Sequence, residues 1–228
     1  ISSLVFLNQV GLKPVILHGA GPMLSEALQK KKIEFSFIDG QRVTSLEVRD
    51  VAYSVFKETN KKIVDALEAQ GAKAKGLISN IFKCTMAHPD LGYVGSIESV
   101  DVNLVNEVLE LDSIPVIAPV GFMGNEVLNI NADIATVELV KAINPYKAIF
   151  LSEIGGIFNK SGQLITNINL ALEYNEFMQE EWLHSGMKLK LEQIKSLLDE
   201  LPKTASVSIT EPLNLPTDLF TASGSGTR

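Results

Sequence analysis

Several classes of protein are excluded by what this sequence has little of. A single cysteine, Cys84, is present among 228 residues, so no internal disulfide can form and a reducing or disulfide-free compartment fits best. No apolar run approaches the ~18 residues that a membrane-spanning helix needs. Acidic residues outnumber basic ones: the chain has 27 Asp and Glu but 20 Lys and Arg, which gives a formal net charge of -7. Nucleic acid and anionic membrane surfaces attract a surplus of positive charge, so we expect neither as a partner.

What the sequence does have is a large apolar content arranged in short runs. Hydrophobic residues make up 46% of the chain, enough for one large domain or two closely packed lobes. Buried strands are predicted at Val15–Leu17, Ile114–Val120 and Lys147–Leu151, and they alternate with helices such as the one from Ser45 to about Gln70. This alternation predicts an α/β fold, a three-layer αβα sandwich whose central sheet is mainly parallel.

The stretch Leu128–Asp133 precedes an apolar-periodic run that predicts a helix. We expect Asn131 at its N-cap and Asp133 in its first turn, where unpaired backbone N–H groups attract acceptors and anions. These positions fit a purely structural cap, and they equally fit a site that uses two amides and one carboxylate. The residues alone leave both interpretations open.

A second candidate is the small-residue loop His18–Pro22, between the first predicted strand and a helix. Small residues let the backbone approach a ligand and the helix N-terminus favours an anion, although a plain turn explains the loop equally well. His18 is expected to pack or to stabilise the turn rather than to act as a base. Arg42 follows a predicted hairpin at Asp39-Gly40 and is either a surface charge or a bidentate clamp for a carboxylate.

Parallel sheets bind ligands beyond the carboxyl ends of their strands. The glycine loop, the Asn-Asp stretch and the turn Ser152–Gly156 are all expected at such ends. Further along, Lys188, Lys190 and Lys195 are by default a solvated helix face. Cys84 is expected to be an inert, small apolar residue.

Six motifs together resemble the amino-acid kinase family in order and spacing, across essentially the whole chain. They are His18–Pro22, Asp39–Thr44, Gly92–Gly95, Pro115–Pro119, Leu128–Asp133 and Gly226–Arg228. The last third of the chain is most similar to the fungal-type mitochondrial members, through segments such as Phe150–Gly156 and Lys188–Lys190. The resemblance implies that ATP phosphorylates the side-chain carboxylate of N-acetyl-L-glutamate, a step in arginine biosynthesis.

The resemblance also implies roles for residues that bind the substrate. Gly19, Ala20 and Gly21 would offer backbone N–H donors near the acceptor carboxylate and the transferred phosphoryl group. Arg42 would hold the α-carboxylate of the substrate, and Asn129 would orient its acetamide and carboxylate end.

Lys190 and Asp133 are the residues expected to be catalytic. By similarity to the family, Lys190 would contact the nucleotide and neutralise the transferred phosphoryl group, and Asp133 would position this lysine. Ser152, Glu153 and Gly155 fall where the family's nucleotide pocket begins. The reaction needs no base, because a carboxylate can attack phosphorus once the repulsion between the two anions is cancelled. Mg²⁺ would arrive with ATP, since no cluster with metal-ligand spacing is evident in the sequence.

The resemblance divides the chain into an N-terminal lobe for acetylglutamate, residues 1–145, and a C-terminal lobe for ATP, residues 146–228. It further implies a homo-oligomer, with arginine as a feedback inhibitor and N-acetylglutamate synthase as a partner. The mitochondrial matrix is the expected location in a fungal-type eukaryote, and the cytoplasm is expected otherwise.

Two alternatives stay open at this point. One is the arginine-binding domain of an N-acetylglutamate synthase, which shares the fold and transfers no phosphate. Lys188 and Lys190 favour a kinase over it, because animal-type synthases have usually lost this pair. The other is a kinase for aspartate or glutamate, which is disfavoured because Arg42 and the pair Asn129 and Asn131 follow the acetylglutamate pattern.

Ile1 opens the chain inside a predicted helix and no Lys-x-Gly-Gly type motif precedes it, which indicates a piece without its N-terminal end. The absent lysine would supply half of the cationic clamp on the phosphates. We therefore predict that the chain as given turns over far more slowly than a version extended upstream. Comparable steady-state turnover by the two versions would contradict this expectation.

Overall fold

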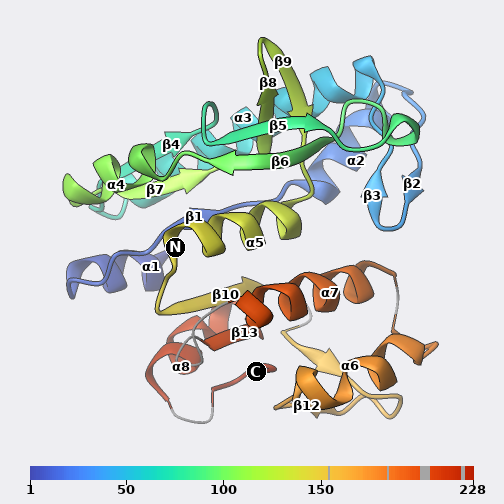
Figure 1. The fold of residues 1–228 in the computed structure, drawn as a ribbon. Helices are drawn as coiled ribbons and strands as arrows, with labels where there is room; N and C mark the ends of the chain where they lie inside the picture. Colours follow the sequence, from blue (N-terminus) through green and yellow to red (C-terminus); the bar gives the residue numbers. More distant parts are fainter. Residues whose placement is uncertain (154, 184, 201–205, 222–223) are drawn as a thin grey trace. The chain divides into compact units, whose positions relative to one another are not determined.

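The computed structural model describes residues 1–153, 155–183, 185–200, 206–221 and 224–228. Their contacts divide the chain into two compact units, Ile1–Ala142 and Ile143–Arg228, which are described one at a time (Figure 1). The lobe boundary predicted after residue 145 falls just beyond this division.

Parallel strand pairs run through the N-terminal unit. One sheet has the order β1 (Ile16–Leu17), β7 (Ile114–Ile117), β4 (Ala74–Leu77), with both pairs parallel. A second sheet has the order β6 (Gly95–Val100), β5 (Phe82–Met86), β8 (Val120–Met123), β9 (Glu126–Asn129), and its central pair is parallel. The predicted hairpin is formed by β2 (Phe37–Ile38) and β3 (Gln41–Arg42). These pairings confirm the α/β class and the mainly parallel pairing.

Helices follow the strands at the positions that their capping residues predict. The unit contains α1 (Ser2–Gln9), α2 (Gly21–Lys30), α3 (Leu46–Glu68), η1 (Pro89–Leu91), α4 (Val102–Glu110) and α5 (Ala132–Ile143). The Oγ of Ser45 accepts from the N–H of Val48 at 3.3 Å at the start of α3. Asp101 Oδ1 accepts from the N–H of Asn103 at 3.0 Å at the start of α4. Both predicted N-caps are thus confirmed.

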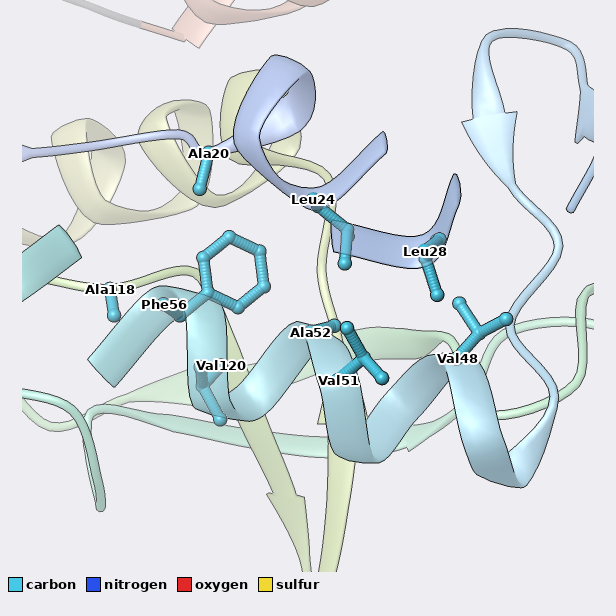
Figure 2. Packing of buried hydrophobic residues seen from close by; sticks show 9 residues of the cluster. All are labelled: Ala20, Leu24, Leu28, Val48, Val51, Ala52, Phe56, Ala118 and Val120. Atoms are coloured by element: carbon cyan, nitrogen blue, oxygen red, sulfur yellow. The ribbon is translucent and has the colours of Figure 1, made fainter. Parts of the chain in front are cut away.

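Packing between α2 and α3 fixes the loop that precedes α2. Figure 2 shows the cluster, which consists of Ala20, Leu24, Leu28, Val48, Val51, Ala52, Phe56, Ala118 and Val120. Leu24 and Leu28 of α2 point toward the side of α3 that carries Val48, Val51 and Ala52 (Figure 2). A fully buried leucine contributes roughly 1.5–3 kcal/mol relative to an exposed one, so this interface holds Ala20 and the residues after β7 in place.

The sequence-based assignment was wrong around two short strands. Residues 114–120 were predicted as one buried strand broken by Pro115 and Pro119. Strand β7 runs through Pro115 to Ile117, and β8 begins at Val120 in a different sheet, so the chain breaks at Pro119 alone of the two. Pro119 lies between them and has no N–H to donate to a continuous ladder. In addition, Leu128 and Asn129 end strand β9, which pairs antiparallel with β8 and was not predicted. The helix begins at Ala132, directly after the predicted N-cap Asn131.

The C-terminal unit is built on one parallel pair. Its elements are β10 (Lys147–Leu151), β11 (Ile157–Phe158), β12 (Leu164–Ile165), α6 (Leu170–Gln179), α7 (Ser185–Glu200), β13 (Ser206–Thr210), η2 (Pro212–Asn214) and α8 (Leu215–Phe220). Strand β10 pairs in parallel with β13, and β11 pairs antiparallel with β12. The long helical region was predicted to be interrupted near His184, and the structure has this interruption between α6 and α7. His184 itself lies outside the described residues.

A buried carboxylate joins the elements of this unit. Asp218 on α8 is fully buried and accepts from Ser208 Oγ at 2.6 Å. Lys147 Nζ lies 2.9 Å from its Oδ2, and Arg228 Nε lies 3.9 Å from its Oδ1. Burial raises the pKa of Asp218, but the hydrogen bonds from Ser208 and Lys147 and the charges of Lys147 and Arg228 outweigh it, so the net shift lowers the pKa.

This arrangement predicts an acid-sensitive contribution to stability. A carboxyl whose folded pKa lies below its unfolded value of about 3.9 stabilises the fold above that value, and the stabilisation is lost as the pH falls through the folded pKa. Asp218→Asn should lower the free energy of unfolding at pH 7 by about 1.5–3 kcal/mol, because a hydrogen-bonded charge is removed. Chemical denaturation at a series of pH values should show the wild-type and variant curves converging below about pH 4.

Asp199→Asn is the matched control for this measurement. Asp199 also pairs with a lysine, Lys195, but its side chain is 60% exposed, so its removal should change stability little. A difference between wild type and Asp218→Asn that stays constant from pH 7 to pH 3 would contradict the assignment.

Candidate functional site

The loop after β1 brings backbone N–H groups to the start of α2. Gly19 and Ala20 lead into Gly21, the first residue of α2, and no side chain caps this helix. Uncapped N–H groups at a helix N-terminus attract anions. A Cβ built on Gly19 would lie 3.4 Å from the Cβ of Ala132, so the loop reaches the start of α5.

His18 packs beside this loop, as predicted, and is not available as a base. Its Nε2 lies 3.2 Å from Asn60 Nδ2, and its Nδ1 lies 3.3 Å from the carbonyl oxygen of Gly19. Burial lowers the pKa of His18, and the hydrogen bond with Gly19 opposes this only in part. The neutral ring therefore accepts from Asn60 at Nε2 and donates to Gly19 from Nδ1.

Arg42 is a buried guanidinium and not a surface charge, since its side chain is among the buried polar groups. Its Cζ lies 4.4 Å from the ring centroid of Phe35 and 4.7 Å from that of Phe37. Nη2 donates to Ser25 Oγ at 2.8 Å and to the carbonyl oxygen of Gly21 at 3.4 Å. Nη1 is buried and has no hydrogen-bond partner among the described residues, and burial lowers the pKa of Arg42. A buried guanidinium donor without an acceptor suits an anionic ligand at Nη1.

Asn129 ends β9 with its amide held on one side. Its backbone N–H donates to the carbonyl oxygen of Tyr93 at 2.9 Å, and Nδ2 donates to Thr44 Oγ1 at 3.1 Å. Within the described part of the chain, its Oδ1 accepts no hydrogen bond. This oxygen is therefore available to a ligand that carries an N–H group.

The start of α5 combines a cap with a nearby carboxylate. Asn131 Oδ1 accepts from the N–H groups of Asp133 at 2.8 Å and of Ile134 at 3.2 Å, which confirms Asn131 as the N-cap. Asp133 stands in the first turn, as predicted. The capping role thus belongs to Asn131, and the carboxylate of Asp133 is not needed for it.

A pocket of about 170 Å³ in the N-terminal unit brings these residues together. Its lining includes every site residue predicted in this unit: Gly19, Ala20, Gly21, Arg42, Asn129 and Asp133. The N-termini of α2 at Gly21 and of α5 at Ala132 both border it. Two helix dipoles and one guanidinium therefore favour negative charge in a pocket that is small by ligand-site standards. The arrangement suits a small dicarboxylate.

Other lining residues were not predicted as part of the site. Phe37 and Gln41 come from the hairpin, and Pro119 and Ile130 lie at the carboxyl ends of β7 and β9. Gln41 adjoins Arg42 in one of the six motifs, and Pro119 ends another, so the motifs could have identified both. Ile130 likewise lies inside the motif Leu128–Asp133, whereas Phe37 follows only from the folded arrangement.

The residues predicted for the nucleotide lie at the end of β10 in the C-terminal unit. The N–H of Ser152 donates to the carbonyl oxygen of Thr210 at 2.9 Å, and the N–H of Gly155 donates to Ser152 O at 3.2 Å. Gly155 has φ +70°, which glycine adopts without strain. Glu153 belongs to this turn, and Ile154 lies outside the described residues. The turn lies at the carboxyl end of β10, beside the parallel strand β13, and ligands of parallel sheets bind at such ends.

The expected solvated lysine face was only partly correct. Lys190 Nζ lies 5.0 Å from the ring centroid of Phe150 on β10, and Lys188 Nζ donates to the carbonyl oxygen of Met178 at 2.9 Å. Lys195 pairs along its own helix, with Asp199. Lys190 belongs to the C-terminal unit and Asp133 to the N-terminal unit, so the predicted pairing of these two residues stays a prediction.

Few other groups offer chemistry. In the part of the chain that the structure describes, no three His, Cys, Asp or Glu side chains are grouped so as to hold a metal ion. Burial raises the pKa of the Cys84 thiol to about 11, which agrees with an inert residue. Among the described helices, none combines the length and the apolar character that crossing a membrane requires.

Comparison with known proteins gives a consistent result. The model of the amino acid kinase family matches residues 1–207. The chain is 44% identical to an acetylglutamate kinase of Xanthomonas campestris, with 99% of this chain and 54% of the relative covered. It is 39% identical to the mitochondrial protein arg-6 of Neurospora crassa, covering 99% of this chain and 26% of the relative. An acetylglutamate kinase of Jannaschia is 35% identical, with 98% and 80% covered.

Solved structures with this fold include proteins of more distant sequence. The smu.665 protein of Streptococcus mutans superposes with a TM-score of 0.86 at 23% identity, over 92% of this chain and 86% of that one. An N-acetylglutamate synthase of Neisseria gonorrhoeae, complexed with coenzyme A and L-arginine, gives a TM-score of 0.81 at 20% identity, over 99% and 55%. At these identities the likeness establishes the fold alone.

The extent of these matches differs between relatives. The chain spans about half the length of the Xanthomonas relative and about a quarter of the Neurospora one, but four fifths of the Jannaschia kinase. The family model covers most of the chain. This chain therefore belongs to the amino acid kinase family.

Proposed function

We propose that this chain is the kinase portion of an acetylglutamate kinase, which transfers the γ-phosphoryl group of ATP to the side-chain carboxylate of N-acetyl-L-glutamate in arginine biosynthesis. The observation that carries the proposal is the small pocket in which Arg42 keeps a buried, unpartnered Nη1 beside two helix N-termini. Acetylglutamate is a small dianion with one amide. The names of the bacterial relatives support the same substrate.

In this proposal the N-terminal lobe, residues 1–145, binds acetylglutamate. Arg42 Nη1 donates to the α-carboxylate, because a charge-assisted hydrogen bond removes the cost of the unpartnered donor. Asn129 Oδ1 accepts from the acetamide N–H. The backbone N–H groups of Gly19, Ala20 and Gly21 hold the side-chain carboxylate and the phosphoryl group that it receives.

The C-terminal lobe, residues 146–228, binds ATP at the turn that contains Ser152, Glu153 and Gly155. A carboxylate oxygen of the substrate attacks the γ-phosphorus, and the bond from that phosphorus to the bridging oxygen of ADP breaks. Lys190 neutralises the charge on the phosphoryl group during transfer, and Asp133 positions Lys190. No proton moves, so the residues act by holding the reactants in line and by cancelling their repulsion.

Mg²⁺ enters with ATP, bound mainly by phosphate oxygens. We further infer that the protein works as a homo-oligomer, that arginine inhibits it and that N-acetylglutamate synthase is a partner. The mitochondrial matrix is the proposed location in a fungal-type eukaryote, in keeping with the names of the fungal relatives, and the cytoplasm is proposed otherwise.

The alternative function is that of an arginine-binding domain without kinase activity. The solved synthase in complex with L-arginine has the same fold, which keeps this alternative in view. The presence of both Lys188 and Lys190 argues against this alternative. Lys188, however, donates to the carbonyl oxygen of Met178, and this structural contact explains its presence without a kinase function. The distinction therefore depends on Lys190.

Kinase activity is tested with the upstream-extended protein, by ADP release that depends on acetylglutamate. Lys190→Ala should lower kcat at least about 10²-fold, because it removes a charge that acts on the transition state. Lys195→Ala is the control and should leave turnover unchanged, since that lysine pairs with Asp199. No ADP release by the unmodified protein, together with tight arginine binding, would establish the alternative.

Arg42→Lys tests the acetylglutamate site separately. Lysine cannot supply the fixed fork of donors, so the KM for acetylglutamate should rise about 10- to 100-fold while the KM for ATP stays unchanged. Arg49→Lys is the matched control, because Arg49 also stacks on an aromatic ring, at 4.7 Å from the Tyr93 centroid, but does not line the pocket. Equal effects of the two substitutions on KM would refute the role of Arg42.

A further inference from the structure

Thr44 lies next to the pocket without lining it. The residue is fully buried, and its Oγ1 donates to the carbonyl oxygen of Arg42 at 2.8 Å. The same oxygen accepts from Asn129 Nδ2 at 3.1 Å. One hydroxyl therefore connects the two residues that the proposed function assigns to the α-carboxylate and to the acetamide of the substrate.

The main chain of Thr44 is fixed on both sides. Its N–H donates to the carbonyl oxygen of Leu91 at 2.8 Å, and its own carbonyl oxygen accepts from the N–H of Tyr93 at 2.7 Å. Gly92 between them has φ +68°, and a Cβ built there would overlap the carbonyl oxygen of Thr44. The backbone of Thr44 thus has little freedom to move relative to Leu91 and Tyr93, and the carbonyl oxygen of Tyr93 in turn accepts from the N–H of Asn129 at 2.9 Å.

The proton of the hydroxyl determines how the amide of Asn129 is turned. A threonine hydroxyl has a single proton, and the carbonyl oxygen of Arg42 can only accept. Once that proton is used at Arg42, Oγ1 can only accept from Asn129, so Nδ2 faces Thr44 and Oδ1 faces away from it. The opposite arrangement, with the hydroxyl donating to Oδ1, would break the bond to Arg42.

We propose that Thr44 is a positioning residue that presents Asn129 Oδ1 to the pocket as an acceptor for a neutral N–H group. The identity of the ligand as an N-acylated amino acid rests on the proposed function; the orienting role of Thr44 does not. A free ammonium group would also donate to Oδ1. Arg42 and the two helix N-termini at the pocket disfavour a second cation, whereas Asp133, which also lines the pocket, attracts one. The orientation of Asn129 therefore supplies an acceptor for the N–H group and does not by itself select acylated over free amino acids.

Kinetics of the upstream-extended protein test this role with Thr44→Val, which keeps the shape and removes the hydroxyl. The KM for acetylglutamate should rise about 5- to 30-fold, because the amide is no longer held, while kcat and the KM for ATP stay within about twofold. Thr44→Ser retains the hydroxyl and should restore the wild-type KM. If Thr44→Val lowers only the melting temperature, the residue is merely structural and the proposal is wrong.

Thr136→Val is the control for loss of a hydrogen-bonded, half-buried hydroxyl of the same unit. Thr136 Oγ1 donates to the carbonyl oxygen of Ala132 at 2.7 Å on α5, and the residue does not line the pocket. Its substitution should leave the KM for acetylglutamate unchanged. An increase equal to that of Thr44→Val would assign the effect to general loosening of the unit and would overturn the proposal.

A second measurement does not depend on the reaction. In the ¹⁵N-labelled chain, the side-chain amide of Asn129 can be assigned by its absence in Asn129→Asp. Its hydrogen exchange should be slow in the wild type and in Thr44→Ser, and at least about tenfold faster in Thr44→Val. The net free energy of one such hydrogen bond corresponds to a change in exchange rate of about this size. Equal exchange in all three would refute the role of Thr44. Protected exchange without any binding of acetylglutamate would support Thr44 and refute the proposed function.

Discussion

The burial of one guanidinium is the constraint on which the N-terminal unit depends. Removing Arg42 from water is unfavourable unless its donors find acceptors, and the fold supplies only some of them, through Ser25 and the first residue of α2. Phe35 and Phe37 cover the guanidinium, so solvent cannot supply the rest freely. The hairpin, the glycine loop and α2 are thereby arranged around this guanidinium, and in the proposed function the substrate carboxylate completes its hydrogen bonds.

Features determined by neighbouring residues were predictable from the sequence. Ser45, Asp101 and Asn131 each accept from an N–H two or three residues away, so a short motif contains both partners of the hydrogen bond. The hairpin at Asp39-Gly40 is equally local, since both residues adopt positive φ. The glycine loop lies where the rule for parallel strands places a ligand site, directly after β1. The Asn-Asp stretch follows β9, which pairs antiparallel with β8, so its place beside the loop did not follow from that rule.

The remaining features depend on residues far apart in the chain. Thr44 and Asn129 are separated by 85 positions, and nothing near either residue indicates the other. The division of residues 114–120 between two sheets depends on partners as distant as β5 and β9, which no local pattern encodes. Whether Arg42 is exposed or buried likewise depends on Phe35 and on α2, so the sequence offered both outcomes equally. The roles of Lys190 and Ser152 came from family resemblance and not from physics.

The hydrogen bonds of His18 have a consequence for how the protein responds to its surroundings. Protonating this ring would require Asn60 to give up its donor contact at Nε2, and Asn60 is itself held by the carbonyl oxygen of Val116 at 2.8 Å. The loop that begins at Gly19 is therefore insulated from modest acidification, although a histidine adjoins it.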